Sequence, residues 1–122
     1  MDTQKRELVV MITHGLDHEL SSAGVLIALG GMTAGMNVSI FLISSAVDIV
    51  RRGAADLTQV KPIDPLLDML HDFIRRGGNL WVCTVCAKNR GYTQDDLIEG
   101  AVIAGASLMH ERIIAGASTL SF

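Results

Sequence analysis

Two cysteines, three positions apart, are the residues of this chain with the clearest potential for chemistry. Cys83 and Cys86 are its only cysteines, and they stand where the apolar run 79–83 gives way to a polar segment. A thiolate is a nucleophile, and a helix N-terminus or a nearby cation lowers the pKa of a cysteine. Lys88 and Arg90 follow closely and are the candidate cations. The pair therefore indicates thiol chemistry, with two buried and inert cysteines as the alternative.

Histidine could assist such chemistry. His14 follows the first apolar run and could orient or deprotonate a sulfur group, because histidine titrates near neutral pH. The alternative for His14 is a strand-end histidine that bonds to the backbone.

A metal site is not expected. A Cys-x-x-Cys pair supplies only half of a tetrahedral zinc site, and no second such pair or His pair stands at zinc-finger spacing. The glycines also match no phosphate-binding loop. We therefore expect neither a metal nor a cofactor. The histidines available as ligands are His14, His18, His71 and His110.

Five short apolar runs alternate with helical segments and must position the cysteines. The expected strands cover residues 8–12, 38–43, 79–83, 101–103 and 119–122. The expected helices cover residues 18–32, 47–52, 65–76 and 106–115, with a short helix after a capping box at 93–96. Asp17 and Asp64 are the predicted N-caps of the first and third helices. This alternation predicts a single domain over 1–122, a three-layer α/β/α sandwich around a mostly parallel five-stranded sheet.

The carboxyl ends of the strands are the expected place for a site. Ligands of parallel sheets bind beyond these ends. Four segments should meet there: residues 13–17, Ser44-Ser45, residues 83–86 and the turn after Ile103. Both cysteines fall on this edge.

Composition excludes several classes of protein. Of 122 residues, 49% are hydrophobic and 19% are charged, so the chain has ample apolar surface to fold. A net charge of −3 and 4% aromatic residues argue against binding to nucleic acid, either by phosphate neutralisation or by base stacking. The apolar excess suggests self-association. The small residues Ala23, Gly24, Ala28 and Gly31 would permit close approach of a second copy or of the chain's own sheet.

Neither a membrane segment nor a leader is expected. Residues 20–47 carry no charge, but glycines interrupt them and their periodicity changes near Asn37, which favours a buried helix followed by a strand. The apolar run 8–12 is too short for the core of a signal peptide. We therefore expect a cytoplasmic protein with reduced thiols.

The cysteine segment has the features of a known family. Cys83-Thr-Val-Cys86-Ala-Lys-Asn-Arg90-Gly91-Tyr92 is followed by Asp96-Leu97-Ile98-x-Gly100 and by the terminal Thr119-Leu120-Ser121-Phe122. Together with the opening strand and the turn at Gly15 to Asp17, this pattern resembles the DsrE/DsrF-like family, which includes the TusD-type sulfur relay subunits.

The resemblance implies a small α/β domain that assembles into trimers or hexamers. Its reactive cysteine would carry sulfane sulfur as a persulfide and exchange it with a donor or acceptor protein that has a reactive thiol. Cys83 matches the family's reactive cysteine by its spacing to Arg90-Gly91. Cys86 would then be a second acceptor or a resolving thiol.

Three functions follow as hypotheses. The first is a sulfur carrier, acting as a sulfurtransferase through Cys83. The second is a thiol–disulfide oxidoreductase or redox switch at Cys83 and Cys86, although Pro62 and Pro65 lie upstream, unlike the cis-proline loop of thioredoxin-like folds. The third is a non-catalytic oligomeric module that binds a ligand or a partner at the same edge.

Overall fold

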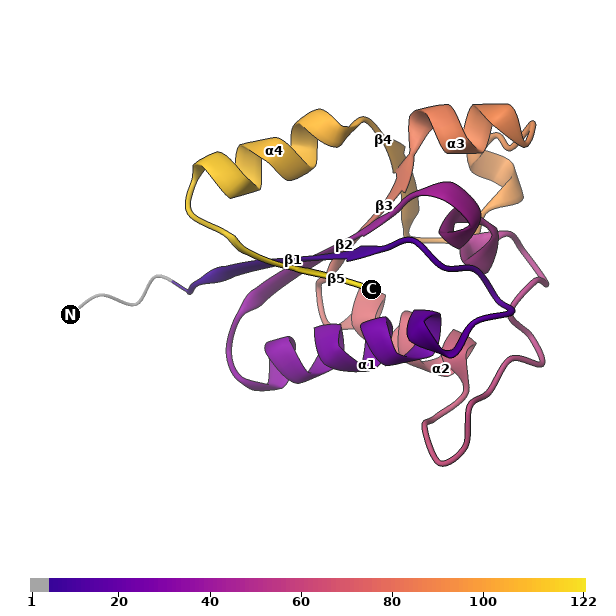
Figure 1. The fold of residues 1–122 in the computed structure, drawn as a ribbon, viewed down its shortest axis with the longest axis horizontal. Coiled ribbons are helices and arrows are strands. Elements are labelled where there is room, and N and C mark those ends of the chain that lie inside the picture. The colour runs from indigo at the N-terminus through magenta and orange to yellow at the C-terminus, as the bar shows by residue number, and fades with distance from the viewer. Residues whose placement is uncertain (1–4) are drawn as a thin grey trace.

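A parallel five-stranded sheet forms the centre of the molecule (Figure 1). A computed structural model describes residues 5–122, so the first four residues of the domain predicted over 1–122 lie outside it. The strand order is β4-β3-β2-β1-β5, and all four pairings are parallel. The strands are β1 (Glu7–Ile12), β2 (Asn37–Leu42), β3 (Asn79–Cys83), β4 (Ala101–Ala104) and β5 (Ser118–Ser121).

Helices cover both faces of this sheet, which confirms the predicted three-layer sandwich. In Figure 1, α1 (Glu19–Thr33) and α2 (Leu66–Arg75) lie together below the sheet, and α4 (Ala106–Ile114) lies above it. The short helix α3 (Thr84–Asn89) continues directly from β3. Two 3₁₀ helices complete the fold, η1 (Ser44–Val50) after β2 and η2 (Gln94–Asp96) before β4.

The order of the strands explains this layering. The chain steps from β1 to β2, β3 and β4 in one direction across the sheet, and then returns to place β5 beside β1. Crossovers between parallel strands are right-handed, so a reversal of direction puts the last helix on the opposite face. Thus α4 lies on the face opposite to α1 and α2.

The two faces differ in how well they are buried. Side chains of β1, β2 and β3 alternate between them, and the face under α1 and α2 carries the larger core, with Val10, Ile40 and Leu80 almost fully buried. The other face centres on Phe41 and Trp81. No residue of α4 is buried, and all four residues of β5 are exposed. The second layer is therefore thin at the β5 edge.

Helix starts differ in detail from the sequence-based expectations. His18, not Asp17, caps α1, because the backbone at His18 is extended and its Nδ1 accepts the Leu20 N–H at 3.1 Å. Asp64 does not cap α2, because Pro65 occupies the capping position and the helix begins at Leu66.

The two 3₁₀ helices correct one expectation and confirm another. The helix expected over 47–52 is the 3₁₀ helix η1, and it begins earlier, at Ser44. The capping box at Thr93 is confirmed, since the Thr93 N–H donates to the Asp96 carboxylate at 2.7 Å, but it opens the three-residue η2 rather than a longer helix.

The uncharged stretch over 20–47 forms a helix followed by a strand, as predicted. It includes most of α1 and the whole of β2. Within residues 5–122, no helix is both long enough and apolar enough to span a bilayer.

The small residues of α1 pack against the chain's own sheet. A Cβ atom on Gly24 would lie 3.0 Å from the Ile12 side chain, and one on Gly31 would lie 2.9 Å from Leu8 Cδ2. Ala28 is fully buried. The sequence left two packing partners open for these small residues, a second copy of the chain or its own sheet. The structure shows that they pack against the sheet.

Two adjacent glycines of α1 provide a matched test of this packing. Gly30 is exposed with nothing near its missing Cβ, so Gly30→Ala should raise the free energy of unfolding by about 0.5–1 kcal/mol, the usual gain of alanine over glycine inside a helix. Gly31→Ala should instead lower it by about 1–3 kcal/mol through overpacking against Leu8 and Val38. Urea denaturation of both variants measures these changes in the free energy of unfolding. The same change in both variants would contradict the packing of Gly31 against Leu8 and Val38.

Candidate functional site

Cys83 lies at the carboxyl edge of the sheet. It is the last residue of β3, it pairs with Ala104 of β4, and it occupies the N-cap position of α3. The side chain is half-buried and packs against the edges of both hydrophobic cores. Cys83 therefore stands between the two layers, at the position where the sequence placed it.

Cys86 lies in the first turn of α3 and contacts the segment that follows β2. Its Sγ accepts a hydrogen bond from the Ser44 backbone N–H at 3.1 Å. Ser44 has a φ of +55°, and it is the single non-glycine residue with positive φ in the part of the chain that the structure describes. A serine in this left-handed region is strained by about 1–2 kcal/mol. This unusual backbone turns the Ser44 N–H toward sulfur.

The pKa of the Cys86 thiol is raised, and burial is the largest cause. Desolvation raises the pKa of the Cys86 thiol, the Ser44 N–H lowers it, and the hydrogen bond with Cys83 and the charge of Cys83 raise it further. The Arg90 guanidinium lowers it, as the smallest of these effects, and the net pKa is raised. The prediction that nearby cations lower the pKa of the cysteines is therefore wrong for Cys86.

Arg90 is paired with a carboxylate. Its Nε lies 3.1 Å from Asp48 Oδ1, and its Nη1 donates to the Cys86 carbonyl oxygen at 3.3 Å. The Tyr92 hydroxyl donates to the same Asp48 oxygen at 2.6 Å. Since Asp48 belongs to η1, these contacts join η1 to the end of α3. They hold Ser44, at the start of η1, beside Cys86.

His14 and Lys88, the other predicted site residues, do not bond to the thiols. The rings of His14 and His18 lie 4.1 Å apart, and His14 Nδ1 lies 3.3 Å from the Thr13 hydroxyl. Lys88 is exposed on α3 and forms no ion pair within residues 5–122.

The predicted meeting of segments at this edge is observed for the turns after β1, β2 and β3. A Cβ on Gly15 would lie 2.9 Å from the Ser45 carbonyl oxygen, and the Ser45 hydroxyl donates to the Thr13 carbonyl at 3.4 Å. The turn after β3 joins them through the contact of Cys86 with Ser44. Between residues 5 and 122, no three His, Cys, Asp or Glu side chains gather as metal ligands do.

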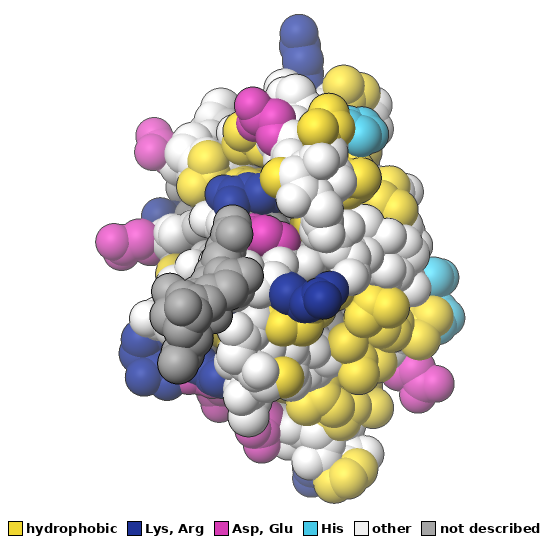
Figure 2. Space-filling view, turned by 90° about the vertical axis from the view of Figure 1, so that its left-hand side faces the viewer, with side chains coloured by type: hydrophobic (Ala, Val, Ile, Leu, Met, Phe, Trp, Pro, Cys, Tyr) yellow, Lys and Arg dark blue, Asp and Glu magenta, His cyan; other side chains and the backbone are white. Residues whose placement is uncertain are grey.

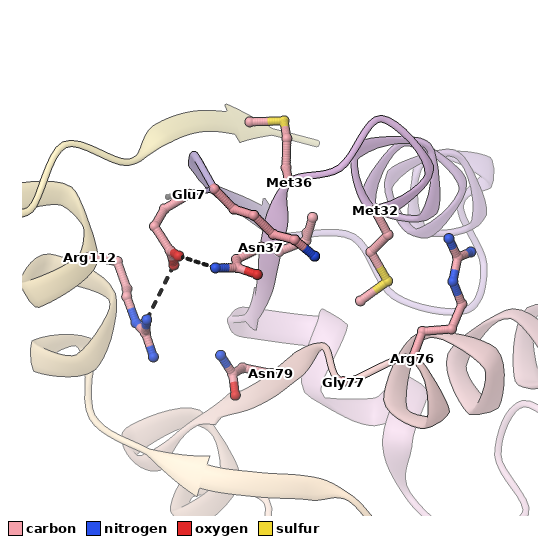
Figure 3. A pocket seen from close by; sticks show the side chains of 10 residues that line it. Glu7, Met32, Met36, Asn37, Arg76, Gly77, Asn79 and Arg112 are labelled. Carbon is pink, nitrogen blue, oxygen red and sulfur yellow. Dashed lines mark hydrogen bonds and ion pairs between the residues drawn. The ribbon is translucent and has the colours of Figure 1, made fainter. Parts of the chain in front are cut away.

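A hollow of about 200 Å³ lies at the opposite, amino edge of the sheet (Figure 3). Glu7 is one of the residues that line it and accepts hydrogen bonds from Asn37 Nδ2 at 2.8 Å and from Arg112 Nη1 at 3.2 Å. Arg112 also lies over the Trp81 ring, 5.9 Å from its centroid. The contacts of Arg112 with Glu7 and Trp81 hold α4 against the sheet, so we assign the hollow a structural role.

Sequence reasoning missed Asp48. A usable signal was present, because Asp48 is the first charged residue after the uncharged stretch 20–47 and stands in an otherwise apolar segment. Its partners Arg90 and Tyr92 are far along the chain, and only the fold brings them to it.

Tyr92 allows a direct test of the Asp48 contacts. Burial, followed by the hydrogen bond to Asp48 and its charge, raises the pKa of Tyr92 above the ordinary value of 10.0. Tyr92 is the only tyrosine, so the absorbance of tyrosinate reports it alone. We expect a titration midpoint above 10 in the native protein, and a lower one in Asp48→Asn but not in the exposed control Asp95→Asn. A native midpoint at or below 10 would contradict the contact.

The same shift predicts a dependence of stability on pH. A raised pKa in the folded state stabilises it fully below about pH 10, and this contribution is lost as the pH rises through the folded-state value. Urea denaturation should therefore show a smaller decrease in the free energy of unfolding above pH 10 for Tyr92→Phe than for the wild-type protein.

Solved structures with the same fold are found in bacteria and archaea. The ychN protein of E. coli superposes with a TM-score of 0.78 at 20% identity, covering 96% of this chain and 99% of that one. The protein MTH1491 of Methanobacterium thermoautotrophicum gives a TM-score of 0.75 at 16% identity, covering 97% and 100%. At these identities the likeness concerns the fold alone.

Sequence relatives point the same way. The uncharacterized protein MJ0989 of Methanocaldococcus jannaschii is 30% identical over 95 residues, which cover 78% of this chain and 77% of that protein. The uncharacterized protein MJ0760 of the same organism is 28% identical over 105 residues, or 85% of this chain, and the match spans 38% of its own length. The pattern of the DsrE/DsrF-like family matches residues 6–122. The chain therefore belongs to the DsrE/DsrF-like family.

Proposed function

We propose that this protein is a sulfur carrier that holds sulfane sulfur as a persulfide on Cys83 and passes it to the thiol of a partner protein. At a coarse level, membership of the family suggests a role in sulfur relay. The observation that carries the proposal is the half-buried Cys83 thiol at the carboxyl edge of the sheet, beside a second sulfur. Such chemistry needs an accessible thiol rather than a large cavity, and a reducing compartment such as the cytoplasm suits it.

Each transfer is a displacement at sulfur. During loading, the Cys83 thiolate attacks a sulfane sulfur of a polysulfide, a new S–S bond forms, and the shortened polysulfide leaves with the electron pair of the broken bond. During delivery, the thiolate of the acceptor attacks the terminal sulfur, and Cys83 leaves as a thiolate. No net oxidant or reductant is required in either step.

Mass spectrometry of the intact protein tests this function. After exposure to polysulfide, the wild-type protein and Cys86→Ser should gain whole sulfur atoms that a reductant removes, because Cys83 remains available in both. Cys83→Ser should gain none while its circular dichroism stays native. Retained loading in Cys83→Ser would place the sulfur on Cys86 and contradict the assignment.

A disulfide switch is the second candidate, favoured by the position of Cys83 directly before α3 and of Cys86 in the first turn of that helix. It would form a Cys83–Cys86 bond with the loss of two hydrogens to a disulfide or polysulfide oxidant, and it would require both cysteines. The same spectra separate the two functions. A protein that shows neither change would be left with the role of a binding module.

We further propose that copies of this chain associate into a trimer or a hexamer through the surface around β5. Within residues 5–122 the outer edge of β5 is unpaired, and an exposed edge strand readily pairs or packs with another chain. Exposed apolar side chains surround it, and hydrophobic side chains gather along the right-hand side of Figure 2. A hollow of about 150 Å³ between α4 and β5 has a mostly apolar lining that includes Ile113 and Leu120. The exposed residues are Leu26 and Ile27 of α1, Ile113 and Ile114 of α4, and Leu120 of β5.

A charge placed on this surface should dissociate the assembly. Leu120 is 43% exposed, so Leu120→Asp should leave the fold of one subunit intact while light scattering shows a fall in mass to the monomer. Leu57→Asp is the matched control, because Leu57 is 99% exposed in a loop outside this surface, and its mass should equal that of the wild type. A wild-type mass of one chain, or an unchanged mass for Leu120→Asp, would rule out this interface.

A further inference from the structure

The side chain of Gln94 occupies the outer edge of β4. This strand ends the sheet on the side away from β5, so no strand within residues 5–122 binds the backbone groups of that edge. Gln94 Nε2 donates to the Ala101 carbonyl oxygen, and Gln94 Oε1 accepts from the Ile103 N–H at 3.0 Å. Ala101 and Ile103 are two positions apart, so these groups lie on the same side of the strand. The amide thus binds the two groups that a partner strand would bind.

The rest of η2 is anchored elsewhere. The capping box of Thr93 and Asp96 closes this short helix, of which Gln94 is the first residue. The Arg52 N–H donates to the Asp96 carbonyl oxygen at 2.9 Å, and Arg52 Nε donates to the Asp95 carbonyl oxygen at 3.0 Å. The far end of η2 is therefore attached to the segment after η1, and the Gln94 amide closes the edge of β4.

The sequence of β4 does little to discourage pairing with another strand. Edge strands are commonly protected by charged residues or by proline. Residues 101–104 are Ala-Val-Ile-Ala and contain neither. Val102 is also 50% exposed. An uncharged apolar strand of this kind readily pairs with a second strand when its edge is open.

We propose that Gln94 is a specificity-determining residue for self-association, because its amide prevents β4 from pairing antiparallel with β4 of a second copy. Without the amide, the Ala101 carbonyl of each copy would accept from the Ile103 N–H of the other. The same surface then lies on both sides of the interface, and a twofold axis passes beside Val102. This inference goes beyond the sulfur-carrier function and involves neither cysteine.

A second copy suits this edge for two reasons. In an antiparallel pair, residues that lie opposite each other exchange their N–H and carbonyl bonds, so β4 of another copy offers a donor to Ala101 and an acceptor to Ile103, as the amide does. Neither strand carries a charge that would repel the other. The edge of β5 remains available for the assembly proposed above.

Light scattering over a range of protein concentrations, in the presence of a reductant, tests this proposal. At high concentration Gln94→Ala should have at least twice the mass of the wild type, and dilution should restore the wild-type mass. Gln94→Asn should behave in the same way, because its amide is one carbon shorter and cannot reach both Ala101 and Ile103. Asp95→Asn is the matched control, since Asp95 is exposed in the same helix, and its mass should equal that of the wild type.

A charge at Val102 tests which edge is used. The twofold axis would place the two Val102 side chains opposite each other, and like charges in that position oppose pairing. Val102→Lys alone should have the wild-type mass and native circular dichroism. Added to Gln94→Ala, it should return the mass to that of the wild type.

The expected increase is a ratio to the wild-type mass, so it applies whether the wild type is a monomer, a trimer or a hexamer. Failure of sulfur loading or of the β5 interface would therefore leave it unchanged. Equal masses for the wild type and both Gln94 variants would overturn the proposal. So would an increase that persists after Val102→Lys, because another surface would then pair. Loss of native circular dichroism in both Gln94 variants would also overturn it, since the amide would then be required for folding.

Discussion

Parallel pairing of all five strands places their carboxyl ends at one edge, and the thiol site depends on this constraint. Leu42 of β2 pairs with Val82 of β3, so the turns that follow the two strands are neighbours. One of these turns contains Ser44 and the other continues through Cys83 into Cys86. The contact between the Ser44 N–H and Cys86 Sγ is therefore a consequence of strand register rather than of any local motif.

The polar contacts at the two ends of the sheet stabilise different parts of the fold. At the amino end, Glu7 binds Arg112 and Asn37, and Arg112 also covers Trp81. These polar contacts hold α4, which has no buried residue of its own, over the thinner face of the sheet. At the carboxyl end, the ion pair between Asp48 and Arg90 joins η1 to the end of α3, and both cysteines beside it are half-buried.

This arrangement changes how the segment from Cys83 to Tyr92 is understood. An arginine seven residues after a cysteine invites the interpretation that its charge stabilises a thiolate. Here the Arg90 guanidinium is paired with Asp48, and its effect on Cys86 is smaller than that of burial. Arg90 and Tyr92 act mainly on structure, since their contacts with Asp48 join η1, which begins at Ser44, to the segment at the end of α3.

The sequence alone determined the strands, the sandwich and the edge at which both cysteines lie, because hydrophobic periodicity and strand-to-helix order are local patterns. It also identified the small residues of α1 as a packing surface, although only the structure showed that the sheet fills it. The choice of His18 over Asp17 as a cap, the left-handed Ser44 and the partners of Asp48 required tertiary structure. The upward shift in the pKa of Cys86 required it as well. Each of these depends on burial or on distances between segments far apart in the chain, which residue types and spacing do not contain.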